Sequence, residues 1–205
     1  MCGLIAVLGN PHEETLRAGV IKARARGPHS HGWAQLLGEV RVRFGDGPLP
    51  MPARAHRSPR ADEPVLVGHS RLATTSREAG SLPRAAEGQP LLGTRWLLAH
   101  NGTVPSLVSS DGREPHDSRG LLERLEAQGL AGLNDSALWE GRPQAMIVYD
   151  LSTAQLYLVR VTGDRLPAHP LYVTTSPTGS IVSSGPVSPE SQLAPEGVTE
   201  LKGVP

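Results

Sequence analysis

Short apolar runs of strand length, separated by turn-forming residues, restrict the fold of this chain most strongly. The first run, residues 3–9, is rich in aliphatic side chains and ends at Gly9-Asn10-Pro11, a sequence that stops a strand. Nineteen prolines and 23 glycines allow many such interruptions. Further strands are predicted at residues 33–37, 40–44, 65–69, 96–100, 145–149, 155–161, 171–175 and 181–184.

Only two segments have the periodicity of a helix. Residues Glu13–Arg26 carry acids early and bases late, which suits the helix dipole. Their expected apolar face consists of Leu16, Val20, Ile21 and Ala25. The second segment, 118–128, places three leucines on one face and follows several strands. This order predicts an α+β fold with antiparallel pairing, because a parallel sheet needs strands and helices in alternation.

The length of 205 residues suits one domain, 1–205, with an irregular tail from about 186 and a possible short strand at 198–202. Lys+Arg and Asp+Glu both number 20, so no charge bias points to nucleic acid or to acidic membranes. We find no apolar run of membrane-spanning length and no basic segment before the first apolar run. A soluble cytoplasmic protein is therefore expected.

Cys2, the only cysteine in the sequence, excludes an internal disulfide and the zinc sites built from several cysteines. Removal of Met1 would leave an α-amine beside the thiol. An α-amine titrates at about 7.7–8.0 and a free thiol at about 8.5, so the neutral amine can take the thiol proton. The alternative is a small buried cysteine that starts the first strand.

Several short stretches, read together with Met1-Cys2-Gly3, resemble the class II (N-terminal nucleophile) glutamine amidotransferases. The likeness is greatest to the glutaminase half of glutamine-dependent asparagine synthetases. It rests on Arg26-Gly27-Pro28, His69-Ser70-Arg71-Leu72-Ala73, Gly88-Gln89-Pro90-Leu91, 97–102 and Asp117-Ser118. The resemblance implies an N-terminal nucleophile (Ntn) hydrolase fold, a four-layer αββα sandwich of two antiparallel sheets. The synthetase half has no counterpart in this sequence.

The resemblance also implies catalytic roles. Cys2 would attack the side-chain amide of glutamine and form a γ-glutamyl thioester, with release of ammonia. Asn101, through its side-chain amide, and Gly102, through its backbone N–H, would bind the developing oxyanion. Without the other stretches, Asn101-Gly102 is more typical of a hairpin turn.

Substrate-binding roles follow from the same resemblance. Arg71 would bind the α-carboxylate of glutamine with its planar guanidinium, and Asp117 would bind the α-ammonium group. The alternative for Asp117 is a cap of the helix at 118–128, and the two roles are compatible. Leu72 and Thr74 belong to a loop expected to border glutamine. Arg26 is expected either to support the fold or to act near the nucleophile.

No metal or cofactor is predicted. The candidate histidine clusters, His29 with His31 and the separate His69, have no further ligand at regular spacing. Arg54, Arg57 and Arg60 lie in a proline-rich stretch and are interpreted as a solvated loop rather than an anion-binding patch.

Three functions remain open at this point. The leading hypothesis is a glutaminase that makes ammonia for a separate synthetase or transferase subunit. The second is an amidohydrolase that removes a γ-glutamyl group from a secondary amide. The third is a catalytically silent docking subunit, which the complete set Cys2, Arg71, Asn101, Gly102 and Asp117 disfavours.

Overall fold

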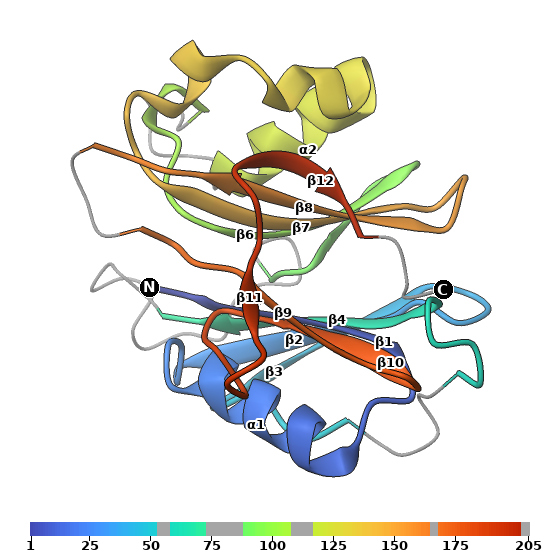
Figure 1. The fold of residues 1–205 in the computed structure, drawn as a ribbon. Coiled ribbons are helices and arrows are strands. Elements are labelled where there is room, and N and C mark those ends of the chain that lie inside the picture. Colours follow the sequence, from blue (N-terminus) through green and yellow to red (C-terminus); the bar gives the residue numbers. More distant parts are fainter. Residues whose placement is uncertain (53–57, 73–87, 108–116, 165–167, 202–205) are drawn as a thin grey trace.

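The protein is a sandwich of two antiparallel sheets between two helices, as Figure 1 shows. The computed structural model describes residues 1–52, 58–72, 88–107, 117–164 and 168–201. From one side to the other, the layers are α2, a five-stranded sheet, a seven-stranded sheet and α1. The predicted α+β class and αββα sandwich are confirmed.

The seven-stranded sheet has the order β11-β9-β10-β1-β4-β2-β3. Its central strand, β1 (Gly3–Gly9), is buried along its whole length and pairs with both β10 and β4. The strand bounds are β2 (Ser30–Gln35), β3 (Arg41–Asp46), β4 (Pro64–Arg71), β9 (Tyr172–Ser176), β10 (Gly179–Ser183) and β11 (Gln192–Leu193).

The five-stranded sheet has the order β12-β8-β7-β6-β5. Its strands are β5 (Leu91–Leu92), β6 (Trp96–Asn101), β7 (Gln144–Asp150), β8 (Gln155–Val161) and β12 (Gly197–Glu200). The tail from 186 was expected to be irregular apart from a possible short strand at 198–202, and it contains both β11 and β12, of which β12 overlaps that predicted strand. Each of these short strands lies at the edge of its sheet, where the ladder of a neighbour, rather than the propensity of the tail, favours pairing.

Each helix covers the outer face of one sheet. Helix α1 (Glu13–Arg24) packs on the seven-stranded sheet through Leu16, Gly19, Val20 and Ala23, and Ile21, expected on this face, is 52% exposed. Helix α2 (Asp117–Gln128) covers the other sheet and is joined by 3-10 turns η1 (Pro105–Leu107), η2 (Gly129–Leu133) and η3 (Ser136–Trp139). Among the described residues, neither helix has the length and apolar character needed to cross a membrane.

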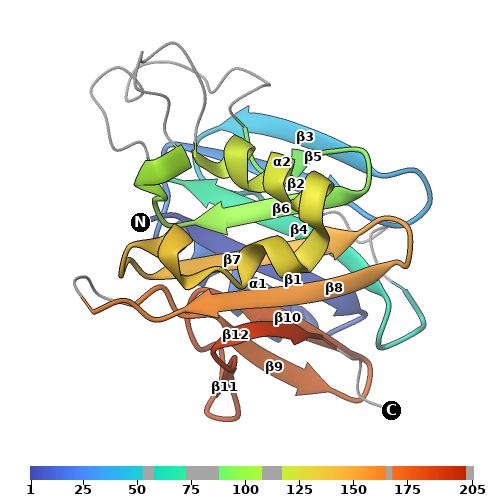
Figure 2. The same cartoon turned by 90° about the horizontal axis from the view of Figure 1, so that it is seen from above.

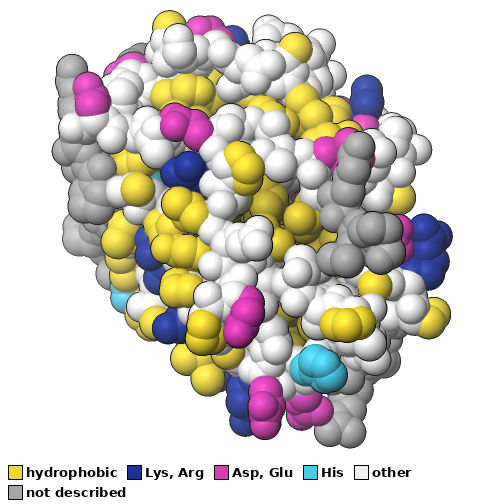
Figure 3. Space-filling view, viewed as in Figure 1, with side chains coloured by type: hydrophobic (Ala, Val, Ile, Leu, Met, Phe, Trp, Pro, Cys, Tyr) yellow, Lys and Arg dark blue, Asp and Glu magenta, His cyan; other side chains and the backbone are white. Residues whose placement is uncertain are grey.

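Strand alternation divides the core into layers. In β1, Leu4, Ala6 and Leu8 face the other sheet, while Ile5 and Val7 face α1, as the two-residue period of a strand requires. Burial of one such aliphatic side chain stabilises the fold by about 1.5–3 kcal/mol. Apolar side chains also reach the surface over the middle of the face in Figure 3, and Leu193 of β11 is 49% exposed.

Three strand ends meet at one end of the sandwich. Strand β1 begins where β4 and β6 finish, and the N-terminus lies beside the tips of these two strands in Figure 2. Gly3 pairs with Ser70 in the shared ladder. The topology therefore brings Cys2, Arg71 and Asn101 to the same end, although they are far apart in the sequence.

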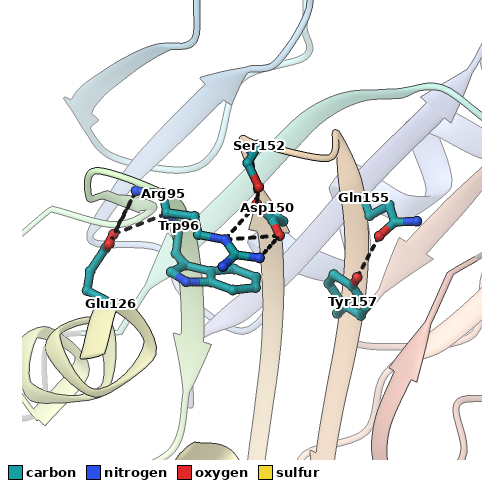
Figure 4. A network of polar contacts seen from close by, with 7 residues as sticks. All are labelled: Arg95, Trp96, Glu126, Asp150, Ser152, Gln155 and Tyr157. Atoms are coloured by element: carbon teal, nitrogen blue, oxygen red, sulfur yellow. Dashed lines mark hydrogen bonds and ion pairs between the residues drawn. The ribbon is translucent and has the colours of Figure 1, made fainter. Parts of the chain in front are cut away.

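A polar network anchors the opposite end of β6 and β7 (Figure 4). The Asp150 carboxylate, whose side chain is 2% exposed, accepts from Arg95 Nη2 at 2.7 Å and from Ser152 Oγ at 2.6 Å. Glu126 of α2 accepts from the backbone N–H groups of Arg95 and Trp96. Burial raises the pKa of Asp150, but the hydrogen bonds from Arg95 and Ser152 outweigh it and hold the pKa well below its usual range.

We predict that Asp150→Ala lowers the free energy of unfolding by about 2 kcal/mol, because Arg95 and Ser152 lose a buried, charged acceptor. The folded-state pKa of Asp150 is depressed, so its contribution is present above the unfolded pKa of about 3.9 and is lost as the pH falls below it. Urea unfolding from pH 7 to pH 3 should therefore show a smaller loss of stability in the variant than in the unmodified protein.

The matched control is Glu39→Gln, which breaks the ion pair between Glu39 and Arg41. The Glu39 side chain is 77% exposed and the Arg41 side chain is 62% exposed. Because exposed pairs contribute little, the denaturation midpoint should not move. Equal effects of the two substitutions would contradict the structural role of Asp150.

Candidate active site

Cys2 precedes the central strand and is tied to the other sheet. Its backbone N–H donates to Oδ1 of Asn101 at 3.0 Å, and the pairing of Gly3 with Ser70 brings Cys2 beside Arg71. Met1 is 48% exposed. The residue that would act as the nucleophile therefore lies at the junction of the two sheets, with its preceding residue open to solvent.

Asn101 is the last residue of β6 and is 3% exposed. Its Oδ1 accepts from Cys2, but its Nδ2 has no hydrogen-bond partner among the described residues. A buried N–H group without a partner costs about 1–3 kcal/mol, so its presence needs an explanation. A donor held beside a thiol can bind an oxygen that becomes negatively charged during a reaction.

The Asn101-Gly102 pair is not a two-residue hairpin turn. After Gly102 the chain enters η1, and the strand that pairs with β6 on this side is β7, which begins at Gln144. A Cβ atom at Gly102 would overlap Oε1 of Gln144. A side chain at this position would therefore require the Gln144 amide to move.

Arg71 and Leu72 lie near the thiol at the end of β4, and Asp117 lies near it at the start of α2. Burial raises the pKa of the Cys2 thiol, whereas a backbone hydrogen bond from Leu72, the N-terminal charge and the Arg71 guanidinium lower it. The Asp117 carboxylate raises it. Opposite charges thus act on one thiol, one from strand β4 and one from helix α2, an arrangement that suits a substrate carrying both a carboxylate and an ammonium group.

The Asp117 carboxylate links α2 to the segment that follows Gly102. Its Oδ2 accepts from the Val104 N–H at 2.7 Å, and its Oδ1 accepts from the Ser118 N–H at 2.8 Å. Asp117 is the first residue of α2 itself, and its carboxylate contacts both this helix and a distant segment. Asp117 and Asn101 are consequently connected through only three intervening residues of main chain.

Arg26 supports the backbone at Cys2. Its Nε donates to the Cys2 carbonyl oxygen at 3.2 Å, and burial lowers the pKa of its guanidinium. Gly27 lets the chain approach β4 closely, because a Cβ atom there would overlap the Ser70 carbonyl. Of the other predicted residues, Thr74, Arg54 and Arg57 lie outside the described residues.

Of the buried polar residues behind the site, His69 was considered from the sequence only as a possible metal ligand, and His100, Ser118 and Gln144 were given no role of their own. His69, buried two residues before Arg71, has its pKa lowered to about 3 by burial and by the charges of Arg71 and His100. His100, Ser118 and Gln144 are also buried. A glutamine at the start of an apolar run was the only signal for Gln144, and a strand end accounts for it equally well.

The His29/His31 and His69 clusters show no metal-binding arrangement. Within the described ranges, no group of three or more His, Cys, Asp or Glu side chains is placed to hold a metal ion.

Comparison with solved structures shows the fold. The chain is similar to a glutamine phosphoribosylpyrophosphate amidotransferase from B. subtilis, complexed with ADP and GMP, with 17% identity and a TM-score of 0.60. It is also similar to a structure described as the allosteric regulatory enzyme of purine biosynthesis, with 17% identity and a TM-score of 0.64. In both cases the match covers 98% of this chain and 49% of the other.

These similarities support the αββα sandwich fold, and this chain spans about half the length of the two solved chains. The particular likeness to asparagine synthetase is not confirmed, since one structure is described as a phosphoribosylpyrophosphate amidotransferase and the other as the allosteric regulatory enzyme of purine biosynthesis. No protein-family model and no curated protein match the sequence.

We predict that the pH at which iodoacetamide modifies Cys2 half-maximally responds in opposite directions to two substitutions. Asp117→Asn removes a negative charge and should lower the thiol pKa, whereas Arg71→Gln removes a positive charge and should raise it. Glu123→Gln, on the exposed side of the same α2 helix, is the control and should leave the midpoint unchanged. Shifts in the same direction for Asp117→Asn and Arg71→Gln would contradict the described arrangement.

Proposed function

We propose that the protein hydrolyses the side-chain amide of L-glutamine through a γ-glutamyl thioester on Cys2. The observation that carries this proposal is the state of Asn101: its Oδ1 binds the Cys2 N–H, and its buried Nδ2 has no partner among the described residues. An amide donor set beside the only thiol suits acyl transfer, in which a carbonyl oxygen becomes an oxyanion.

The reaction begins with the thiol of Cys2 after removal of Met1. Burial raises the thiol pKa, so a base must take the proton, and the new α-amine of Cys2 is that base. The thiolate attacks the amide carbon, and the oxyanion accepts from Asn101 Nδ2 and the Gly102 N–H. The protonated amine then gives its proton to the leaving nitrogen, the C–N bond breaks and ammonia departs.

Hydrolysis of the thioester uses the same groups. The α-amine takes a proton from water, the resulting hydroxide attacks the thioester carbon, and the same donors bind the second oxyanion. The C–S bond breaks, glutamate leaves and the sulfur regains a proton. Because Oδ1 of Asn101 accepts from the nitrogen of Cys2, one side chain can orient both the base and the oxyanion.

Substrate recognition is assigned to the two charges that act on the thiol. Arg71 binds the α-carboxylate, and Asp117 binds the α-ammonium group. When the ammonium group occupies its place beside Asp117, it reduces the effect by which this carboxylate raises the thiol pKa. Substrate binding would thereby favour deprotonation of the nucleophile.

Ammonia needs an acceptor, and we assign that role to a separate synthetase or transferase. Ammonia is small and is mostly protonated in water, so direct transfer to an adjacent site conserves it. The partner would dock over the mouth that includes Leu72 and Asn101–Thr103. A lid completed by the partner would make turnover slow in its absence.

We predict that the active protein starts at Cys2, which intact-mass measurement would show as loss of one methionine. Cys2→Ala should abolish glutamate release, and Cys2→Ser should retain little. A glutamate inserted between Met1 and Cys2 should block methionine removal and leave a folded, inactive protein, because it deprives the thiol of its base. Normal turnover by this folded insertion variant would refute the role of the amine.

A further prediction separates ammonia supply from hydrolysis of a larger substrate. Glutamate release from glutamine should rise when a candidate synthetase or transferase is added, and the two proteins should co-purify. The comparison substrate is a γ-glutamyl amide of an alkylamine. If no candidate changes the rate and this secondary amide is hydrolysed faster than glutamine, the protein is a γ-glutamyl amidohydrolase rather than an ammonia-supplying subunit.

A further inference from the structure

Buried polar side chains surround the segment His100–Val104, which carries the two proposed oxyanion donors. His100 is 2% exposed, Ser118 3% and Gln144 0%. Three elements supply the groups around this segment: the chain before β5 supplies Gln89, the start of α2 supplies Asp117 and Ser118, and the start of β7 supplies Gln144. The segment is therefore held by side chains rather than only by the sheet ladder.

The contacts of Gln144 determine how its amide is oriented. Its Nε2 donates to the Thr103 carbonyl at 3.0 Å, so its Oε1 faces Nε2 of His100 at 2.9 Å. Because Oε1 can only accept, the ring proton of His100 lies on Nε2. Gln144 thus binds the residue before Asn101 and the residue after Gly102.

The remaining contacts agree with this assignment. Nδ1 of His100 accepts from Ser118 Oγ at 2.9 Å, and this contact is preferred to the 3.4 Å distance from the same hydroxyl to Asp117 Oδ1. Gln89 Nε2 donates to Ser118 Oγ at 3.0 Å, and Gln89 Oε1 accepts from the His100 N–H at 2.6 Å. In this network of Gln89, His100, Ser118 and Gln144, every hydrogen bond therefore joins a group that can donate to an atom that can accept.

Gln144 also touches the backbone between these two contacts. Its Oε1 fills the space that a Cβ atom of Gly102 would need. Loss of the side chain would therefore leave space beside Gly102 and remove the acceptor for His100 and the donor to Thr103. Both effects act on the direction in which the Gly102 N–H and the Asn101 amide point.

We propose that Gln144 is a positioning residue for the oxyanion hole, an inference that rests on the proposed function. Its described hydrogen bonds go to His100, Thr103 and Arg142, not to the thiol or to the residues assigned to substrate binding. It acts by fixing the segment on both sides of the donor pair. Loss of Gln144 should therefore slow the chemical step, measured as kcat, and leave the affinity for substrate nearly unchanged.

The first test compares Gln144→Ala with Val148→Ala in glutamate release. Val148 lies four residues further along β7, is buried and packs on the α2 side, so its truncation controls for lost stability. Gln144→Ala should lower kcat about 10- to 100-fold, since displacement of a reacting group by about 1 Å can cost 100-fold, with KM changed less than about 3-fold. Val148→Ala, assayed below both melting temperatures, should keep the kcat of the unmodified protein.

The second variant, Gln144→Glu, tests the hydrogen bonds separately from side-chain size. When ionised, the carboxylate still accepts from His100 but repels the Thr103 carbonyl. When protonated, it can donate to that carbonyl as the amide does. Burial raises the pKa of such a carboxyl, so the ratio of its kcat to that of the unmodified protein should rise toward one as the pH falls from 8 to 5.

Hydrogen exchange of the backbone amides of 100–104 provides a readout without substrate and should become faster in Gln144→Ala than in Val148→Ala. An unchanged kcat in Gln144→Ala, or a pH-independent ratio in Gln144→Glu, would overturn the positioning role while the function stands. Absence of hydrolysis of glutamine and of γ-glutamyl amides by the unmodified, Met1-processed protein would instead refute the proposed function and this inference with it.

Discussion

The hydrogen bond from the Cys2 N–H to Asn101 Oδ1 is the contact on which the site depends. It joins the residue before β1 to the last residue of β6. These strands belong to different sheets, so the hydrogen bond can form only when the two sheets are packed in their native relative position. The core between the sheets, built in part from Leu4, Ala99 and Ile147, sets that stacking. An apolar packing arrangement thus determines the placement of a polar pair of atoms.

The end of the sandwich that holds Cys2 contains buried polar groups, which an apolar core normally does not contain. Asn101 Nδ2 and His69 Nε2 are buried without partners among the described side chains, and each such group costs stability. The satisfied contacts of Gln144 and Asp117 surround them, and the Arg95–Asp150 network anchors the far end of the same strands. Buried polar atoms without partners also occur in the described structure at Trp96 Nε1, His169 Nδ1 and Ser188 Oγ, so what distinguishes Asn101 is its hydrogen bond to Cys2.

Much of the architecture could be predicted because strand periodicity and Gly/Pro punctuation are local signals. Residues 145–149 and 155–161 lie within the observed β7 and β8, whereas 33–37 was placed too late relative to β2. The edge strands β11 and β12 could not be predicted as reliably, because their pairing depends on the neighbouring strands β9 and β8 rather than on the local sequence. The grouping of Cys2, Arg71, Asn101 and Asp117 followed from motifs, but Gln144 acts through tertiary contacts that have no local pattern.

In the proposed reaction, Cys2 carries the γ-glutamyl group during turnover. The direct measurement is rapid acid quenching of the protein during reaction with isotope-labelled glutamine, followed by mass analysis of the N-terminal peptide. We expect a peptide that begins at Cys2 and carries one labelled glutamyl group, held as a thioester or transferred to the adjacent amine, and no labelled group on the corresponding peptide of Cys2→Ala. Steady glutamate release without any label on this peptide, or label on another residue, would contradict it.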